Sequence, residues 1–163
     1  MKYISTRGGG NPQNFVNVML QGLAPDGGLF IPQEWPSFET DQLKRLSGVP
    51  YTDVAYEVIR PFVDDEIPAD TLKDIIKKVY RDNFDHACVA PLVQISPNTW
   101  ILELFHGPTL AFKDYALQLL GHLFDYILEQ RGERVTIVGA TSGDTGSAAI
   151  EACKGCKNID ILI

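Results

Sequence analysis

The segment that most constrains the fold is an apolar run that leads directly into a loop of small residues. Residues 134–140 form a near-continuous apolar stretch of the kind found in strands buried inside a parallel sheet. A helix is predicted over residues 144–153, and a second apolar strand over residues 159–163. Two such strands joined by one helix and short loops predict a βαβ unit, and therefore a parallel sheet.

The loop between the first strand and the helix carries a second prediction. It consists of six small residues, Thr141, Ser142, Gly143, Asp144, Thr145 and Gly146. Ligands of open parallel sheets bind beyond the carboxyl ends of the strands, and a helix N-terminus offers unpaired N–H groups to an anion. The glycines permit close backbone approach, and the hydroxyls add donors. We therefore predict an anion-binding loop, with a tight turn capped by Ser or Asp as the alternative.

Two better-known loop motifs do not fit this segment. It is not a GxGxxG pattern, and it lacks the lysine of a phosphate-binding P-loop. Residues 139–143 superficially echo a nucleophile elbow with Thr141 in the nucleophile position, but that motif needs an acid and then a histidine downstream. All three histidines, His86, His106 and His122, precede Thr141. We reject the nucleophile interpretation for that reason.

Lys113 occupies an unusual position. It is the only Lys or Arg between Arg81 and Arg131, and it falls in the first turn of an apolar helix predicted over residues 112–130. A helix N-terminus disfavours a cation and apolar neighbours disfavour it again, so both effects lower the pKa of a lysine. A neutral amine is what Schiff-base chemistry requires. The alternative is a surface lysine paired with Asp114 at a helix start.

Three other residues are weaker candidates. His106 is either an acid–base group or a structural hydrogen-bonding residue before a turn. Cys153 and Cys156 form a CxxC pattern that suits half a metal site or a redox pair, but the only other cysteine is the distant Cys88. We therefore predict no metal site.

The first half of the chain differs from the second in its pattern of apolar residues. It is predicted to hold short strands and helices, over residues 3–5, 14–23, 29–31, 40–46, 52–59 and 70–80. Pro61 is expected to end the helix before it, because proline lacks a backbone donor. A hairpin over residues 91–105 opens the second half. These patterns predict a mainly helical domain over residues 1–85 and an α/β domain over residues 86–163.

Composition excludes several classes of function. The 163 residues carry a formal net charge of −7, so a nucleic acid is an unfavourable partner. The longest apolar stretch is interrupted by charged and polar residues, so no membrane span is predicted. Three cysteines are too few for a disulfide framework, and we expect a cytoplasmic location.

Three motifs in order resemble a known family. They are Tyr3–Gly8 with Gly22–Pro32, His106–Asp114 and Ala140–Gly146. Together they look like threonine synthase, a pyridoxal-phosphate enzyme of fold type II with the tryptophan-synthase-β-like fold. The resemblance covers the chain from Tyr3 to Ile163, and three separate motifs make it specific.

The resemblance implies roles for particular residues. Lys113 matches the lysine that links covalently to pyridoxal 5′-phosphate, and Asp144 stands near the cofactor ring oxygen where many relatives carry Asn. The substrate-facing residues would be Thr141, Ser142, Gly143, Thr145 and Gly146. The implied lyase reaction converts a phosphorylated amino acid, O-phospho-L-homoserine, and water to L-threonine and phosphate in threonine biosynthesis. A threonine-synthase-like phospho-lyase, which gives a keto acid and ammonia, is the alternative.

The resemblance also implies that sequence is missing. Family members are much longer, and their cofactor-phosphate loop and the group facing the ring nitrogen come from later sequence. The last apolar strand also lacks a following helix to cover it. We therefore expect an N-terminal portion that is inactive alone. A hypothesis of another class is a non-catalytic module that binds an anion or a partner protein; a nucleotide-binding domain is disfavoured by the absent fingerprint. The sequence does not predict the oligomeric state.

Overall fold

A computed structural model describes residues 1–163 and divides into two compact units, Met1–Lys73 and Asp74–Ile163. The boundary between the units falls within helix α4 (Ala69–Tyr80). The domain boundary after residue 85, which the distribution of apolar runs along the sequence suggests, stays a prediction.

The first unit opens with a small antiparallel sheet. Strand β1 (Tyr3–Ser5) pairs with β2 (Phe30–Pro32), with Tyr3 opposite Pro32, which confirms both short strands. Between them lies helix α1 (Phe15–Gln21). Its N-terminus is capped because the Asn14 side chain accepts a hydrogen bond from the Asn17 N–H at 3.1 Å.

Two further helices and a short 3₁₀ helix complete most of this unit. They are α2 (Thr40–Arg45), α3 (Tyr51–Val63) and the 3₁₀ turn Asp64–Glu66. The prediction that Pro61 ends the third helix is wrong, because α3 continues through it to Val63. Pro61 leaves only the Glu57 carbonyl without a helical donor, and Glu57 is an exposed residue, so water can replace that donor.

The second unit begins with the C-terminal part of α4, which confirms the helix predicted over residues 70–80 and is amphipathic. Ile76 and Val79 are buried, while Lys77 and Lys78 are exposed. Beyond the helix, the Phe84 ring lies 4.8 Å from the Tyr115 ring, measured between centroids. This aromatic contact helps to fix the segment that leads toward the functional loops.

A hairpin follows, as the sequence predicts. Strands β3 (Leu92–Ser96) and β4 (Thr99–Leu102) pair in antiparallel fashion, with Val93 opposite Ile101. Every residue of both strands is exposed.

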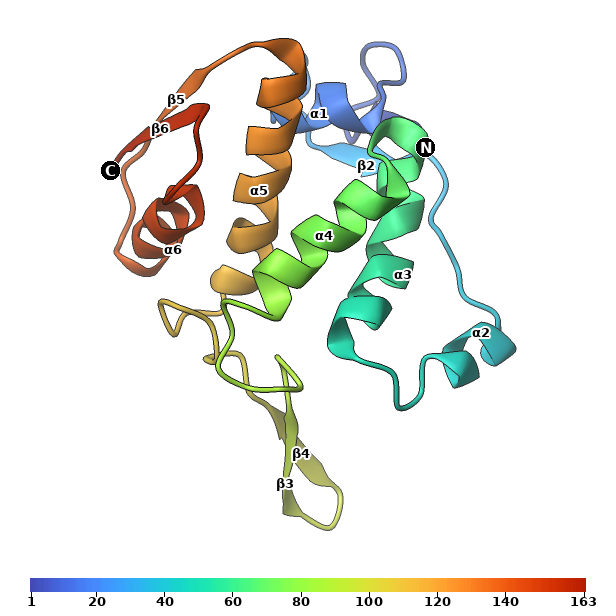
Figure 1. Ribbon diagram of the computed structural model, residues 1–163. Coiled ribbons are helices and arrows are strands. Elements are labelled where there is room, and N and C mark those ends of the chain that lie inside the picture. Colours follow the sequence, from blue (N-terminus) through green and yellow to red (C-terminus); the bar gives the residue numbers. More distant parts are fainter. The chain divides into compact units, whose positions relative to one another are not determined.

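The βαβ unit is also confirmed (Figure 1). After helix α5 (Asp114–Arg131), strand β5 (Val135–Val138), helix α6 (Asp144–Cys153) and strand β6 (Ile159–Leu162) follow in order. The two strands are parallel neighbours.

The burial of these two strands differs from the prediction. Both were expected to be covered, but Val138 is 76% exposed and Leu162 is 63% exposed. Their apolar composition suits a wider, doubly covered sheet, whereas here the sheet has only two strands, of which β6 packs against α6.

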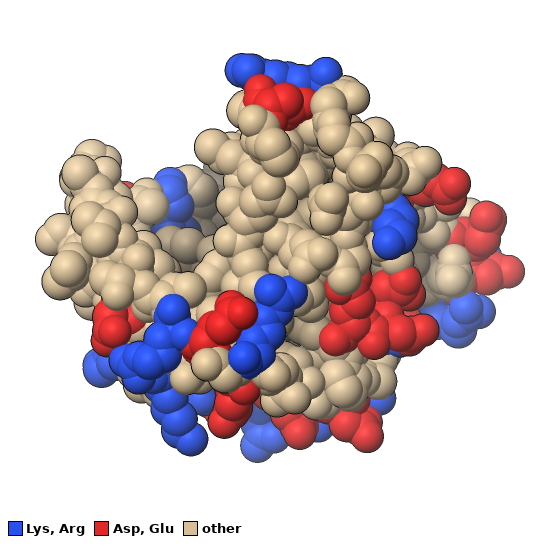
Figure 2. Space-filling model, turned by 90° about the horizontal axis from the view of Figure 1, so that it is seen from above, with Lys and Arg blue, Asp and Glu red and all other residues tan.

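Charge on the surface is mixed. On the face shown in Figure 2, basic side chains lie among acidic ones. Short-range ion pairs of the chain include Lys44 with Asp41 and Lys154 with Glu151. None of the helices has the length and apolar character that a bilayer crossing requires.

Candidate functional site

Helices α5 and α6 pack together and run in the same direction. A Cβ atom added to Gly121 would lie 2.6 Å from the carbonyl oxygen of Ala152, so the two backbones are in close contact. Further along α5, Asp125 Oδ1 accepts hydrogen bonds from the N–H groups of Lys157 and Asn158, at 3.0 and 2.9 Å. The contacts therefore follow the same order along α5 and along the segment that begins with α6, as expected for two parallel helices.

This register brings two predicted site elements to one end of the helix pair. Lys113 precedes Gly121 by the same number of residues as Asp144 precedes Ala152. Lys113 caps the start of α5, and Asp144 is the first residue of α6. The loop that holds residues 141–146 also follows the carboxyl end of β5, where parallel sheets bind their ligands.

The Lys113 side chain has no acidic partner. It is half-buried, and its Nζ atom lies 3.7 Å from the centroid of the Phe112 ring. No carboxylate lies within ion-pair distance of it, so the alternative of a lysine paired with Asp114 does not hold. Lys113 lies at the N-cap of α5 rather than in its first turn.

Asp114 instead faces the interior. Its side chain is 0% exposed, and both carboxylate oxygens accept hydrogen bonds from Thr109. The backbone N–H donates at 2.9 Å and the hydroxyl at 2.7 Å. Between these two residues, Leu110 adopts a φ of +63°, a left-handed conformation that costs a residue with a Cβ roughly 1–3 kcal/mol. Sequence reasoning missed this contact, although a Thr five residues before an Asp at a helix start was the available signal.

The 141–146 loop is held together by Thr141. Its Oγ1 atom accepts hydrogen bonds from the N–H groups of Gly146, at 2.9 Å, and Gly143, at 3.3 Å. A Cβ on Gly146 would lie 2.6 Å from this oxygen, and Gly143 has a φ of +128° that side chains rarely adopt. Thr141 therefore holds the turn, whereas the alternative considered from the sequence was a cap by Ser or Asp.

Other donors of the loop remain open. The N–H groups of Asp144 and Thr145 begin α6, have no intrahelical acceptor and make no other backbone bond. The hydroxyls of Ser142 and Thr145 also make no hydrogen bond. Unpaired N–H groups at the positive end of a helix dipole suit a carboxylate or phosphate.

The weaker candidates have structural partners. His106 Nε2 lies 2.7 Å from Glu103 Oε2. Burial raises the pKa of the Cys153 thiol and raises that of Cys156 to about 11, so both thiols stay protonated at neutral pH and are poor nucleophiles and ligands. No group of three or more His, Cys, Asp or Glu side chains is placed to hold a metal ion.

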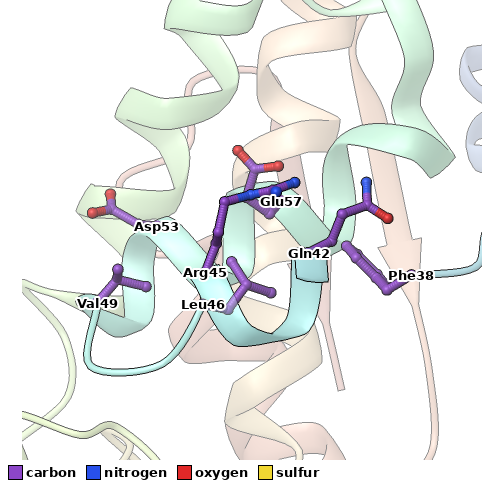
Figure 3. Close-up of a pocket in the computed structure, with 7 residues that line it drawn as sticks. All are labelled: Phe38, Gln42, Arg45, Leu46, Val49, Asp53 and Glu57. Carbon is purple, nitrogen blue, oxygen red and sulfur yellow. The ribbon is translucent and has the colours of Figure 1, made fainter. Parts of the chain in front are cut away.

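A separate cleft lies between α2 and α3 in the first unit (Figure 3). It has a volume of about 290 Å³ and is lined by Phe38, Gln42, Arg45, Leu46, Val49, Asp53 and Glu57. None of these is a predicted site residue, and the charged ones are exposed. Water screens such exposed charges, which weakens their hold on a small ligand.

The residues near the start of α5 and α6 fit a cofactor that carries an aldehyde and a substrate that carries an anionic group. Lys113 supplies a primary amine that no carboxylate holds. The start of α6 supplies unfilled N–H donors and hydroxyls. The two thiols of the CxxC pattern and the imidazole of His106 supply neither a primary amine nor open N–H donors at a helix start.

Comparisons with known proteins show which family the sequence is similar to. Residues 2–80 match the family model described as "Threonine synthase N terminus". Threonine synthase of Pseudomonas aeruginosa is 55% identical over 163 residues, which are 100% of this chain and 34% of the relative. Threonine synthase-like 2 of Homo sapiens is 42% identical over 164 residues, again 100% of this chain and 34% of the relative.

A solved structure is similar along the whole chain. It is the X-ray structure described as PLP-bound threonine synthase from Brucella melitensis, with a TM-score of 0.96 and 55% identity. The match covers 99% of this chain and 34% of that one, so the chain spans about a third of the length of its relatives. The fold is thus that of the N-terminal third of a pyridoxal-phosphate enzyme. The chain belongs to the threonine synthase family, of which it represents the N-terminal region.

Proposed function

We propose that this chain is the N-terminal portion of a pyridoxal-phosphate-dependent threonine synthase. The reaction is conversion of O-phospho-L-homoserine and water to L-threonine and phosphate. The observation that carries the proposal is the amine of Lys113, free of any acidic partner, at the same end of the helix pair as the open N–H groups of α6. The similarity to a PLP-bound threonine synthase supports it.

Lys113 is the proposed cofactor lysine. Pyridoxal 5′-phosphate, when bound, supplies a ring that accepts electron density from a substrate carbanion. An amine without a carboxylate partner is available to the cofactor aldehyde, because no ion pair has to be broken first. Asp144 starts α6 at the same end and is the proposed neighbour of the cofactor ring oxygen.

The 141–146 loop is the proposed substrate cradle. The N–H groups of Asp144 and Thr145 would bind a carboxylate or phosphate together with the Ser142 hydroxyl. Thr141 accepts two N–H groups with its oxygen and keeps its own proton to donate. Gly143 and Gly146 allow the backbone to come close to the substrate.

Lys113 is also the proposed proton carrier. Its Nζ atom, which no carboxylate holds, would take a proton from the substrate carbons and return it. The adjacent Phe112 ring leaves that face of the amine without a competing hydrogen-bond acceptor.

The chain alone is proposed to form no threonine. It spans about a third of its relatives, and the remaining cofactor contacts are proposed to come from later sequence. The protein is proposed to work in the cytoplasm.

Complementation tests the proposal. The full-length gene, of whose product this chain is the proposed N-terminal portion, is placed in a bacterial strain that lacks threonine synthase, as wild type, Lys113→Arg and Lys154→Arg. Wild type and Lys154→Arg are expected to restore growth without threonine, and Lys113→Arg is expected not to, because Arg cannot form the covalent link. Growth by Lys113→Arg equal to wild type would overturn the role of Lys113.

The phospho-lyase alternative needs a product assay. Purified wild-type gene product is given O-phospho-L-homoserine, and threonine, keto acid and phosphate are measured together. Threonine in amounts matching phosphate supports the synthase. Keto acid and ammonia without threonine would support the phospho-lyase.

A further inference from the structure

We propose that Asp114 is a positioning residue for Lys113, acting through Thr109. The inference rests on the proposed role of Lys113 and adds a residue that never touches the cofactor. Asp114 and Thr109 enclose the segment of residues 110–113, whose last residue is the lysine.

The burial of Asp114 shows that its contacts matter. A carboxylate removed from water is unfavourable unless donors compensate it. Asp114 is fully buried and follows Lys113 directly in the sequence, yet its carboxylate makes no ion pair with the Lys113 amine. Both of its oxygens are satisfied by Thr109 alone, through the backbone N–H and the hydroxyl. The carboxylate therefore serves the loop rather than the charge of Lys113.

The enclosed segment is bent in two places. The Leu110 N–H donates to the Gly107 carbonyl at 3.1 Å, and the Asp114 N–H donates to the Ala111 carbonyl at 3.0 Å. Leu110 is left-handed, which is an unfavourable conformation that persists only where surrounding contacts enforce it. The two bonds from Thr109 to Asp114 are the side-chain contacts that close this segment.

Gly107 makes room for the carboxylate. A Cβ at this position would lie 2.5 Å from Asp114 Oδ2 and 2.6 Å from Asp114 Cβ. Its φ is not positive, so the need for glycine here is spatial rather than conformational. The segment from Gly107 onward is thus packed around Asp114.

The same residue also fixes where the helix starts. Asp114 is the first residue of α5, where a negative charge interacts favourably with the helix dipole. Its neighbour Tyr115 is anchored as well, because its hydroxyl donates to the Val89 carbonyl at 2.7 Å. Lys113 therefore lies between a closed loop and an anchored helix, and its amine is presented from a defined position.

The test measures how readily Lys113 takes the cofactor. The full-length gene product is mixed with pyridoxal 5′-phosphate, and borohydride is added at set times. The amine nitrogen bonds to the aldehyde carbon with loss of water, and borohydride delivers a hydride that fixes the new C–N bond. Peptide mass analysis then gives labelling at Lys113 relative to exposed Lys154 in the same sample.

Four variants separate positioning from general stability. Asp114→Ala and Thr109→Val remove the contact from either side, and Thr109→Ser keeps the hydroxyl. Asp125→Ala is the matched control, because Asp125 also accepts two backbone N–H groups in this unit but lies away from the lysine loop. Circular dichroism confirms that each variant is folded.

We expect Asp114→Ala and Thr109→Val to lower relative labelling of Lys113 about tenfold, the effect of losing a hydrogen bond to a charged group. Thr109→Ser and Asp125→Ala should stay within about twofold of wild type. If Asp114→Ala does not fold, Thr109→Val decides. Equal labelling of wild type and a folded Thr109→Val would overturn the inference, as would an equal loss in Asp125→Ala.

The proposed function and this inference fail differently. If wild type shows no preference for Lys113 over Lys154, the role of Lys113 as cofactor lysine is overturned. If wild type prefers Lys113 and the folded Asp114 and Thr109 variants do so equally, only the positioning role is overturned. Reductive methylation with formaldehyde, read at the same two lysines, repeats the comparison without the cofactor.

Discussion

Gly121 of α5 lies directly against the carbonyl group of Ala152 of α6. No side chain fits between these two backbones, so the helices approach more closely than ordinary side-chain packing allows. This contact holds the two helices together, and their common direction brings their starts, at Lys113 and Asp144, to one end. The position of the proposed cofactor lysine relative to the substrate loop therefore depends on a residue far from both.

Replacing Gly121 tests this contact. Gly121→Ala gains up to about 1 kcal/mol of helix propensity but overpacks the interface, which costs about 1–3 kcal/mol. We expect a net loss of about 1 kcal/mol in the free energy of unfolding, measured by urea titration. The exposed α5 substitution Ala116→Ser should change it by less than about 0.5 kcal/mol. A stabilised Gly121→Ala would show that the helices are free to separate.

The first unit should lose stability in acid through Asp26. The Ser5 hydroxyl donates to the Asp26 carboxylate at 2.7 Å, and the N–H groups of Gly28 and Gly9 donate at 2.9 Å. These bonds hold the pKa of Asp26 below its ordinary value of 3.8, the Ser5 bond contributing most. The stabilisation is therefore present above pH 3.8 and is lost as the pH falls through the lower pKa of the folded state.

The matched variants are Asp26→Asn and the exposed Asp41→Asn. In urea titrations, the difference between wild type and Asp26→Asn should be largest near pH 7 and shrink below pH 3.8. A difference that stays constant from pH 7 to pH 3 would contradict the ionised contact.

The free energy of unfolding of the second unit should depend on the protonation of His122, in a higher pH range than that of Asp26. Burial lowers the pKa of His122 below its ordinary 6.5, nearby Lys78 lowers it further, and Asp125 partly opposes the shift. A folded state that resists protonation loses stability as the pH falls below 6.5. In wild type but not in His122→Gln, the free energy of unfolding should therefore decrease between pH 7.5 and about 5. If the free energy of unfolding changed equally with pH in wild type and in His122→Gln, protonation of His122 would not be its cause.

Local patterns predicted much of this fold, because the βαβ unit depends on short-range signals. The apolar run of residues 134–140 lies within a few residues of the strand it defines, and Gly132 ends α5 in a left-handed conformation. Lys113 became a candidate for a similar reason, since an isolated lysine in an apolar stretch is visible without a structure, and its role as cofactor lysine stays a prediction. The helix past Pro61 was missed because the cost of a proline depends on whether the Glu57 carbonyl reaches water.

The contacts of the site were harder to predict. Adjacent opposite charges suggested that Lys113 pairs with Asp114, and only the structure shows Asp114 turned inward to Thr109. Burial depends on the fold around a residue, so sequence spacing does not reveal it. The cap from Thr141 was missed likewise, because Ser142 and Asp144 are equally good capping types in the same loop.

The most direct test of the central claim maps the lysine that takes the cofactor. The full-length gene product, as wild type and as Lys113→Arg, is exposed to pyridoxal 5′-phosphate, reduced with borohydride and analysed by peptide mass. We predict a pyridoxyl group on Lys113 in wild type, in clear excess over each of the other lysines, and no replacement site of equal labelling in Lys113→Arg. Labelling spread evenly over exposed lysines such as Lys77 and Lys154, unchanged by Lys113→Arg, would contradict the account.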